Sequence, residues 1–477
     1  MPASLFATSW HVGLLQMYTL PSQVKNLVQD GDTIYIDGGV YLNDAVKWTH
    51  RDLKFIGLGS GAQRTVLQYS GDIPNGKGIF VFETPGSCDN AYVENIIFDG
   101  AQVSDANGAN GAGIRFQAKD LTVVNCKFVN CQNGILEGNG SVSTSNVTLR
   151  NCEFENNGYQ LPNDPTYSGY EHHIYISAST DTLLVTNCYF HDPRGQANSL
   201  KTRAQKSYIL YNYIDEANGY GSWEIDIAQG GMNVIMGNVI VQGASGANHG
   251  IIGYDAVTNP IEEFYFVNNT VINKFSGNVK YFNAAPTGIN VFKVYNNIFA
   301  SVIGASTNFM TGNIPVVLDT VSNQIFSDYM NVGFVDPSIG DYNLLSSATS
   351  VIDATVNAGS TNDGFLLSPD SFYVNFQNAL SPRVIYGNAL DAGAFEYSGS
   401  STVFENAERE FSVYPNPASE YLMIETKGKF DYVLRDLFGR ALRQGISNEL
   451  VRISLSDIST GCYSLEVDGR FFNLVIN

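Results

Sequence analysis

The chain has 477 residues, of which 44% are hydrophobic and only 15% are charged, so its length and composition indicate a large folded protein with a polar, weakly charged surface. The formal net charge of -20 argues against a nucleic-acid or anionic-membrane partner, because such partners are repelled unless a local basic patch exists. No apolar run approaches the roughly 20 residues of a membrane helix, so we expect no membrane span.

The first 30 residues end in a segment that predicts an end cap. The stretch LPSQVKNLVQDGDTIYIDGG predicts a short helix from about Ser22, then a turn at Asp30-Gly31-Asp32 that leads into the first strand. We expect residues 1–29 to form an N-terminal segment with a capping helix. A cap is needed because the open end of a strand solenoid exposes an unpaired sheet edge.

A short motif then recurs along the chain as VVNCKF, LRNCEF, VTNCYF, LYNYI, MGNVI, VNNTVI and YNNIF. Aligned on the large apolar residue two positions downstream, these segments share one column, formed by Cys126, Cys152, Cys188, Asn212, Asn238, Asn269 and Asn297. The spacing within the column varies from 24 residues (188 to 212) to 36 residues (152 to 188). Short β-branched and aromatic segments separated by Gly, Asn and Asp favour a solenoid of strands.

We therefore predict an all-β fold, a parallel β-helix over residues 30–397, right-handed by the general preference of parallel crossovers. Stacked coils place like residues above one another, so the Asn amides can pair with their neighbours and with turn backbone. The leading cysteines are predicted to be small apolar members of the same inward stack. The six cysteines show no CxxC and no Cys/His spacing, so no zinc site is expected.

The C-terminal part carries two resemblances. The segments GDYNLLSSATSVIDA and NALDAGAFEY are similar to the closing segments of many secreted bacterial β-helix proteins, which implies that the solenoid ends near Tyr397. After a predicted linker at 398–404, residues 405–477 resemble the C-terminal sorting domain of the type IX secretion system of Bacteroidetes. The motif YPNPAS from Tyr414, Asp436 to Arg440, and the GCY from Gly461 occur in the expected order.

The sorting-domain resemblance implies a small β-sandwich tail, type IX secretion machinery as a partner, and a secreted or cell-surface protein. It implies nothing about catalysis. We expect a monomer.

A second register in the solenoid predicts which side chains face solvent. Short strands are anchored on the apolar residues Ile114, Ile135, Ile174, Leu200, Ile225 and Ile251. If the anchors point inward, the residues on either side point outward, because side chains alternate along a strand. Three outer columns follow: His173, Ser199 and Glu224; Tyr175, Lys201 and Asp226; Ser177, Arg203 and Ala228.

The second and third columns hold an isolated basic cluster. No Lys or Arg lies between Arg150 and Arg194, nor between Lys206 and Lys274. Elimination next to a uronate carboxylate requires that this carboxylate be neutralised before the neighbouring carbon loses its proton. Lys201 is predicted to be the base and Arg203 the neutralising group, with Tyr175 or His173 protonating the leaving oxygen.

Glu224 and Asp226 beside Lys201 favour the charged form of that lysine and so oppose its role as base, unless they bind a cation. Both carboxylates are therefore candidate ligands of Ca²⁺, the one cofactor that we expect, if any is used. Around the cluster, four side chains are predicted to bind an acidic polysaccharide through charge or ring stacking: Arg115, Arg194, Trp223 and Tyr254.

The Lys201 and Arg203 pair resembles β-helix polysaccharide lyases of the alginate lyase and chondroitinase B family, which use a Lys and an Arg on the sheet face. The resemblance implies Lys201 as base and Arg203 as neutralising partner or acid, although here both fall on one rung.

Two alternatives stay open. A glycoside hydrolase would use Glu224 and Asp226, about 6.6 to 7 Å apart along one strand. A noncatalytic glycan-binding or adhesion protein would need only the basic and aromatic face, and opposite charges on neighbouring strands also pair for structural reasons alone.

Overall fold

The computed structural model describes residues 7–83, 86–138, 145–159, 169–216, 218–248, 250–284, 287–398, 412–415, 418–436, 440–467 and 470–476. The chain divides into two compact units, residues 1–399 and 400–477, which are treated separately below. Among the described residues, none of the helices is long and apolar enough to cross a membrane.

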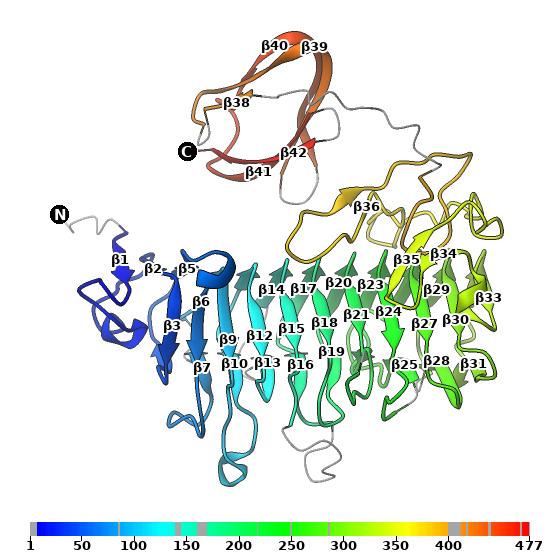
Figure 1. The fold of residues 1–477 in the computed structure, drawn as a ribbon, viewed down its shortest axis with the longest axis horizontal. Helices are drawn as coiled ribbons and strands as arrows, with labels where there is room; N and C mark the ends of the chain where they lie inside the picture. The colour runs from blue at the N-terminus through cyan, green and yellow to red at the C-terminus, as the bar shows by residue number, and fades with distance from the viewer. Residues whose placement is uncertain are drawn as a thin grey trace. The chain divides into compact units, whose positions relative to one another are not determined.

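The first unit is a parallel β-helix in which each coil adds one strand to each of three sheets, here named A, B and C (Figure 1). Sheet A has twelve strands, in the order β1 (Ser9–Val12), β2 (Thr33–Ile36), β5 (Lys54–Gly57), β8 (Ala91–Glu94), β11 (Leu121–Val124), β14 (Ser145–Arg150), β17 (Thr180–Thr186), β20 (Lys206–Leu210), β23 (Met232–Met236), β26 (Glu263–Val267), β29 (Val291–Tyr295) and β32 (Leu318–Val321).

Sheet B has eleven strands, in the order β3 (Gly39–Leu42), β6 (Thr65–Gln68), β9 (Ile96–Asp99), β12 (Lys127–Val129), β15 (Glu153–Glu155), β18 (Tyr189–His191), β21 (Tyr213–Asp215), β24 (Val239–Gln242), β27 (Thr270–Asn273), β30 (Ile298–Ser301) and β33 (Gln324–Phe326). Sheet C has ten, in the order β4 (Val46–Trp48), β7 (Gly78–Phe82), β10 (Ala112–Phe116), β13 (Asn133–Glu137), β16 (His172–Ile176), β19 (Asn198–Thr202), β22 (Ile225–Ile227), β25 (Gly250–Tyr254), β28 (Asn278–Ala284) and β31 (Ser306–Gly312). The predicted solenoid is confirmed.

The predicted column of asparagines lines the turn between sheets A and B and forms a continuous ladder. The backbone N–H and the Nδ2 of Asn212 both donate to Oδ1 of Asn238, at 2.8 and 3.0 Å. The same pair of bonds links Asn238 to Asn269 and Asn269 to Asn297. The backbone N–H of Cys188 donates to Oδ1 of Asn212 at 2.9 Å, so cysteines and asparagines share one column. Each amide therefore satisfies backbone groups that the turn would otherwise bury unpaired.

The N-terminal cap is present but contains little helix. Its regular part is a single 3₁₀ turn, η1 (Pro21–Gln23), followed by Val24 and Val28, both of which are fully buried in the solenoid core. The predicted helix from about Ser22 is reduced to this turn and the turns after it, where backbone bonds span three residues, as from the N–H of Val24 to Pro21 and from the N–H of Leu27 to Val24. Two more 3₁₀ turns, η2 (Gly61–Gln63) and η3 (Asp105–Asn107), lie in later loops.

After β33, residues 329–397 pack along the outside of the solenoid. They include η4 (Tyr329–Asn331) and the antiparallel pairs β34 (Phe334–Asp336) with β35 (Asp341–Leu344), and β36 (Ser371–Phe372) with β37 (Ser381–Pro382). One apolar cluster joins this segment to the outer face of sheet B, and another joins it to the outer face of sheet A. No described residue of sheet C belongs to either cluster.

The second unit is a small antiparallel sheet. It contains β38 (Ser412–Tyr414), β39 (Tyr421–Arg435), β40 (Ala441–Ser454), β41 (Gly461–Val467) and β42 (Arg470–Ile476), with β39 pairing with β38, β40 and β41. Its core is made of buried aliphatic side chains from several strands, including Leu422, Ile424, Leu434, Leu465 and Leu474. An all-β tail is what the sequence predicts here.

Candidate functional site

Side chains in the sheet C strands do not alternate strictly. Over five successive positions they point outward, inward, inward, outward and inward. In β16, His173, Ile174 and Ile176 are fully buried, whereas Tyr175 is half-buried on the outer face. The first of the two consecutive inward positions faces the aromatic side chains of sheet B. In earlier coils this position is glycine: a Cβ on Gly113 or Gly134 would lie 2.7 or 2.9 Å from the rings of Phe128 or Phe154.

This pattern overturns the predicted outer column of His173, Ser199 and Glu224. The His173 ring lies inside, 6.4 Å from Phe154 and 6.2 Å from Phe190, and its Nδ1 accepts from Nδ2 of Asn157 at 3.0 Å. Burial, followed by the positive charge of His191, lowers the pKa of His173 to about 3. His173 is thus a neutral interior side chain and cannot reach a ligand on sheet C.

Glu224 also faces the interior of the solenoid. The predictions that Glu224 and Asp226 together bind a cation, or form an acid and base pair, are therefore wrong. Its side chain is 2% exposed, and neither carboxylate oxygen has a hydrogen-bond partner among the described residues. Burial, followed by the charge of Glu216, raises the pKa of Glu224 well above its usual range, so the carboxyl is protonated. Asp226 is two residues away on the opposite side of the strand.

Tyr254 is a third misplaced prediction, and its error comes from register. The strand partner of Ile225 is Ile252, one residue later than the predicted anchor Ile251. Tyr254 therefore faces the core, where its ring lies 5.8 Å from that of Phe264. Its hydroxyl donates to Glu262 at 2.6 Å, so it provides no surface for a sugar.

The second predicted column is present as expected. Tyr175, Lys201 and Asp226 are direct partners on β16, β19 and β22. Nζ of Lys201 lies 2.7 Å from Oδ2 of Asp226, and Nδ2 of Asn198 donates to the same oxygen at 2.7 Å. The other oxygen, Oδ1, is buried and has no partner within the described part of the chain. Asp226 therefore holds the lysine, and its carboxylate also lies within hydrogen-bonding reach of the Asp255 carboxyl.

Arg203 and His172 lie on either side of Tyr175. The guanidinium carbon of Arg203 is 5.7 Å from the Tyr175 ring centre, and the His172 ring stacks on Tyr175 at 5.8 Å. Nδ1 of His172 accepts the backbone N–H of Asn198 at 3.2 Å, which leaves its proton on Nε2. Burial, followed by the charges of Lys201 and Arg203, lowers the pKa of His172 well below its usual value. The sequence analysis missed this neutral histidine because it assigned His173 to the outer face.

Asp255 is a second missed residue. It follows β25 directly, two positions after Gly253, the strand partner of Asp226. Although the residue as a whole is exposed, partial desolvation of its carboxyl, then the charge of Asp226, raises the pKa of Asp255 to about 6. In the sequence, Asp255 is a carboxylate at the end of a predicted strand. Placing it beside Asp226 required the correct register of that strand.

The indole of Trp223 packs directly against the backbone of two glycines, Gly250 and Gly253. A Cβ on Gly250 would lie 2.3 Å from the indole, and one on Gly253 would lie 3.2 Å from it. The indole of Trp223, which is half-buried, thus extends across the outer face of β25, beside Asp226. Its predicted place on the open face is consistent with this geometry.

Arg115 lines a cavity at the other end of the same face. Arg115, Leu136 and Tyr175 are successive strand partners. The cavity measures about 500 Å³, within the range of small-ligand pockets, and its lining residues are Gly108, Ala109, Asn110, Arg115, Leu136, Tyr170 and Tyr175. Burial lowers the pKa of Arg115, which stays charged.

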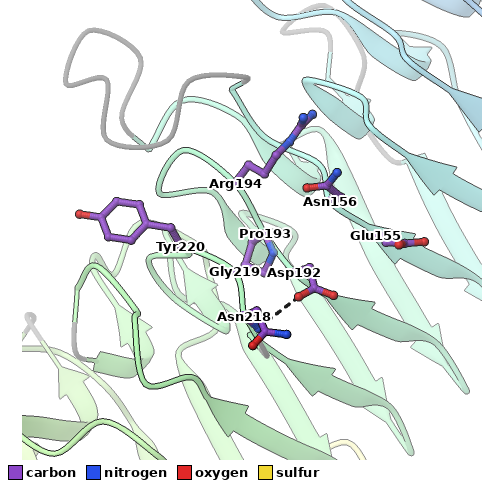
Figure 2. Close-up of a pocket in the computed structure, with 8 residues that line it drawn as sticks. All are labelled: Glu155, Asn156, Asp192, Pro193, Arg194, Asn218, Gly219 and Tyr220. Atoms are coloured by element: carbon purple, nitrogen blue, oxygen red, sulfur yellow. Dashed lines mark hydrogen bonds between the residues drawn. The ribbon is translucent and has the colours of Figure 1, made fainter.

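Arg194 lies in a different place, in the loop between β18 and β19. There it lines a separate cavity of about 360 Å³ with Asp192, Tyr220 and other loop residues, none of which is Lys201 or Arg203. Figure 2 shows the Arg194 side chain directed away from Asp192, whose carboxylate accepts the backbone N–H of Asn218 at 3.1 Å. The structure does not bring Arg194 together with the sheet C residues.

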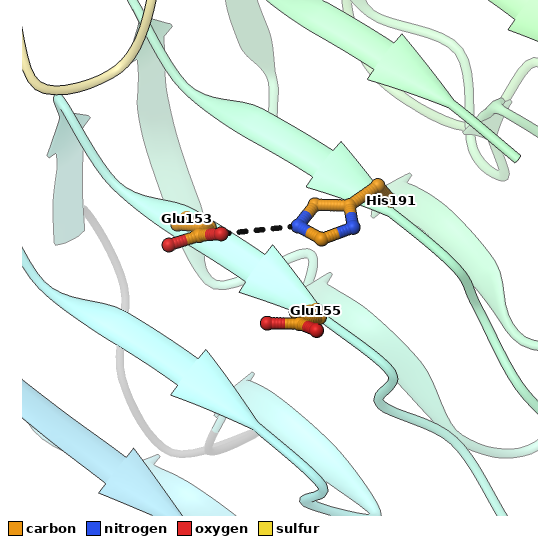
Figure 3. Close-up of side chains that lie close together, drawn as sticks. All are labelled: Glu153, Glu155 and His191. Atoms are coloured by element: carbon orange, nitrogen blue, oxygen red, sulfur yellow. Dashed lines mark hydrogen bonds and ion pairs between the residues drawn. The ribbon is translucent and has the colours of Figure 1, made fainter. Parts of the chain in front are cut away.

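Sheet B carries a cluster with the residue types of a metal site, Glu153, Glu155 and His191 (Figure 3). Nζ of Lys127 already contacts both glutamates, at 3.1 Å from Glu153. Burial alone would lower the pKa of His191, but hydrogen bonds to Asp192 and Glu153 raise it to about 9. A protonated imidazole has no lone pair for a metal, so this cluster is an ion-pair network.

Comparison with known proteins identifies the tail. Residues 412–471 match the secretion system C-terminal sorting domain, which indicates a secreted or cell-surface protein. No curated protein matches the chain.

Several solved structures resemble the fold. Pectate lyase Pel9A is 12% identical with a TM-score of 0.43, over 82% of this chain and 96% of that one. The PL6 family alginate lyase AlyGC is 10% identical with a TM-score of 0.40, over 77% of this chain and 59% of that one. The tailspike protein gp49 of Acinetobacter baumannii bacteriophage Fri1, a capsular polysaccharide depolymerase, is 9% identical with a TM-score of 0.35, over 98% and 81%. At these values the resemblances do not identify a substrate or a reaction.

Proposed function

We propose that the protein binds an acidic polysaccharide on the outer face of sheet C and cleaves it by β-elimination beside a uronate. The observation that carries this proposal is the gathering of Arg115, Lys201 and Arg203 around Tyr175 on one face. The chain as a whole has a net charge of -20, and residues 329–397 cover sheets A and B but not this face. A cationic patch of this kind attracts a polyanion that the rest of the surface repels.

Arg203 is the proposed partner of the substrate carboxylate. Its guanidinium lies over the Tyr175 ring, and within the described residues no carboxylate forms an ion pair with it. A planar guanidinium binds a carboxylate through two parallel hydrogen bonds. In this role Arg203 lowers the cost of the enolate that forms when the neighbouring carbon loses its proton.

Lys201 is the proposed base and Tyr175 the proposed acid, since both lie on adjacent rungs of the same column. The Lys201 amine takes the proton from the carbon next to the carboxylate, and Asp226, 2.7 Å away, positions the amine. The bond from C4 to the glycosidic oxygen then breaks as Tyr175 gives its proton to that oxygen. The product has a C4–C5 double bond, and the proton held by Lys201 returns to Tyr175 through solvent.

A role for Ca²⁺ is part of the proposal, with Asp255 in place of Glu224 as the second carboxylate. Glu224 faces the interior, so Asp226 and Asp255 are the side chains that would hold the ion, and Oδ1 of Asp226 is a buried acceptor without a partner among the described residues. When bound, Ca²⁺ would supply further neutralisation of the substrate carboxylate.

The test uses the full chain with polymers of different uronates, with and without Ca²⁺, and follows the ultraviolet absorbance of unsaturated uronate together with reducing ends. Both signals should rise, and Lys201→Ala should abolish them. Lys47→Ala is the matched control, because Lys47 faces outward in the same column, is paired with Glu83 at 3.0 Å, and is separated from Lys201 by the partners Val81, Arg115, Leu136 and Tyr175. Equal loss in both variants, or no signal on any uronate polymer, contradicts the elimination mechanism.

Hydrolysis is the second candidate, and Asp255 is the observation that favours it. A carboxyl whose pKa is raised to about 6 beside a second carboxylate is the arrangement of an acid and base pair in glycoside hydrolases. Reducing ends without ultraviolet absorbance, lost in Asp255→Asn, would establish hydrolysis. Binding without either signal would establish a glycan-binding protein.

A further inference from the structure

The solenoid is closed at one end and open at the other. At the N-terminal end, the cap that follows β1 buries Val24 and Val28 fully in the core. At the other end, β31, β32 and β33 are the last strands of sheets C, A and B, and none of the described strands pairs with their outer edges. These strands belong to the last coil, residues 302–326. Alternate backbone N–H and C=O groups along its edges therefore have no strand partner.

The apolar side chains that point into the core from the last coil are left uncovered. Phe299 of β30 is fully buried, whereas its strand partner in the last coil, Ile325, is 62% exposed. Phe282 of β28 is buried, and its strand partner Met310 is only half-buried. The end of the solenoid thus presents a cross-section of the apolar core to solvent.

The last coil also lacks the charges with which proteins usually protect a sheet edge. Residues 294–318 contain no charged side chain, and Asp319 is the only one between there and Phe326. The Asp319 carboxylate accepts a hydrogen bond from the hydroxyl of Tyr295 at 2.6 Å, and Asp319 is the strand partner of Lys293 on the outer face of sheet A. An uncharged apolar edge is a template for pairing with another chain. The net charge of -20 makes two copies repel each other elsewhere, but this end is nearly neutral.

We propose that two copies of the chain associate end to end through their last coils. A second copy fits this end because the cap leaves each chain a single open end, so pairing two open ends covers both and closes the assembly as a two-fold symmetric dimer. This arrangement departs from the monomer expected from the sequence, because the exposure of Ile325 and Met310 is a property of the folded chain.

The lengths of the edge strands match this symmetry. A two-fold axis across the end reverses the strand direction, so the edges of the two copies pair as antiparallel strands. With the axis through the middle of sheet C, β31 pairs with β31 of the second copy. In the same arrangement β32, which has 4 residues, meets β33 of the second copy, which has 3. The sheet C faces of the two copies then adjoin at β31. The dimer does not rest on the proposed function, since no residue of the last coil is assigned to the reaction.

The test measures the mass of the full chain by light scattering after size-exclusion chromatography. We expect about twice 52.0 kDa at micromolar concentration. Ile325→Lys should raise the dissociation constant of the dimer by at least about 100-fold, because the dimer would bury two unpaired ammonium groups. Leu15→Lys is the matched control: it adds the same charge at the capped end, where Leu15 is 99% exposed, and should remain dimeric.

Hydrogen exchange of the same proteins locates the contact. The amides of β31 and β33 should exchange slowly in the full chain and rapidly in Ile325→Lys, while those of β30 stay slow in both and report an intact solenoid. A dimer that survives Ile325→Lys forms through another surface and overturns the proposal. A monomeric full chain overturns it as well, and slow exchange at β31 in that monomer would mean that another segment of the same chain covers the last coil.

Discussion

Two lysines on different sheets of the solenoid contact carboxylates of neighbouring strands, and their surroundings differ. On sheet B, Lys127 contacts Glu153 and Glu155, and His191 donates to Glu153 at 3.1 Å, so every charge has a partner. On sheet C, Lys201 contacts Asp226, whose second oxygen is buried without a partner in the described chain. Cross-strand charge pairs alone therefore do not mark a site, whereas unsatisfied polar groups beside them do.

The comparison is sharpened most by removing Arg203, which follows β19 of sheet C and has no ion pair among the described residues. Arg203→Ala should lower kcat/KM on the preferred polymer by about 100- to 1000-fold, because the enolate loses its preorganised counter-charge. Lys127→Ala removes a cation of equal charge from sheet B and should leave kcat/KM within about twofold. Steady-state kinetics on both variants measure the difference, and a similar loss in the two would mean that general charge, and not the sheet C geometry, supports activity.

The reverse experiment asks which lysine stabilises the fold. Lys127→Ala leaves Glu153 and Glu155 facing each other with only His191 to compensate, so we expect the free energy of unfolding to fall by about 1 to 3 kcal/mol. Urea unfolding of this variant and of Lys201→Ala makes the comparison. Lys201→Ala should also cost stability, because it leaves the buried Asp226 without its cation. No loss in Lys127→Ala would contradict the structural role of the sheet B cluster.

Buried acids give the protein a pH-dependent stability. Burial raises the pKa of Glu216 to about 8, and burial followed by the charge of Asp105 raises the pKa of Glu171 to about 8. An acid with a raised pKa keeps its proton in the folded state and loses it in the unfolded state, so the free energy of unfolding falls as the pH rises toward 8. The pKa of His191, raised to about 9, acts in the same direction, because its bound proton favours the folded state.

The measurement is a series of thermal melts between pH 6.5 and 8, a window that lies above the usual pKa of His173, 6.5, and so excludes its opposing effect. We expect Tm to fall by on the order of 5 °C across it. Glu216→Gln removes the titrating proton and keeps one oxygen acceptor, for the backbone N–H of Gly221 or that of Gly243, so it should reduce the fall. A Tm that rises with pH in this window would contradict the assignment.

The smallest expected effect is at the far end of the open face. Arg115 lies two strand partners from Tyr175 and lines a cavity of about 500 Å³, so it is placed to bind a more distant unit of the polymer. Arg115→Ala should raise KM about threefold to tenfold with kcat nearly unchanged, since the contact is equal in the ground and transition states. A fall in kcat at constant KM would instead move Arg115 to the reacting unit.

Much of this architecture could be predicted from the residues themselves. The recurring column of Cys126 to Asn297, the solenoid and the all-β tail follow from local patterns that repeat along the chain, and the Tyr175, Lys201 and Asp226 column follows from a strand period of two. These features depend on neighbours in the sequence, or on the same position in the next repeat, so they are visible without coordinates.

Other features depended on contacts between segments far apart in the chain. His173 turns inward against the Phe154 and Phe190 rings of sheet B, and Glu224 occupies the same inward position two coils later. Asp255 reaches Asp226 only because Ile252, and not Ile251, pairs with Ile225. Residues 329–397 pack on sheets A and B, and no described residue of sheet C belongs to the apolar clusters that they form. The sequence by itself determined the repeat and the residues available to each coil. Tertiary packing decided which side of each strand they face, since a one-residue shift costs little locally and is fixed only by what the opposite sheet can accommodate.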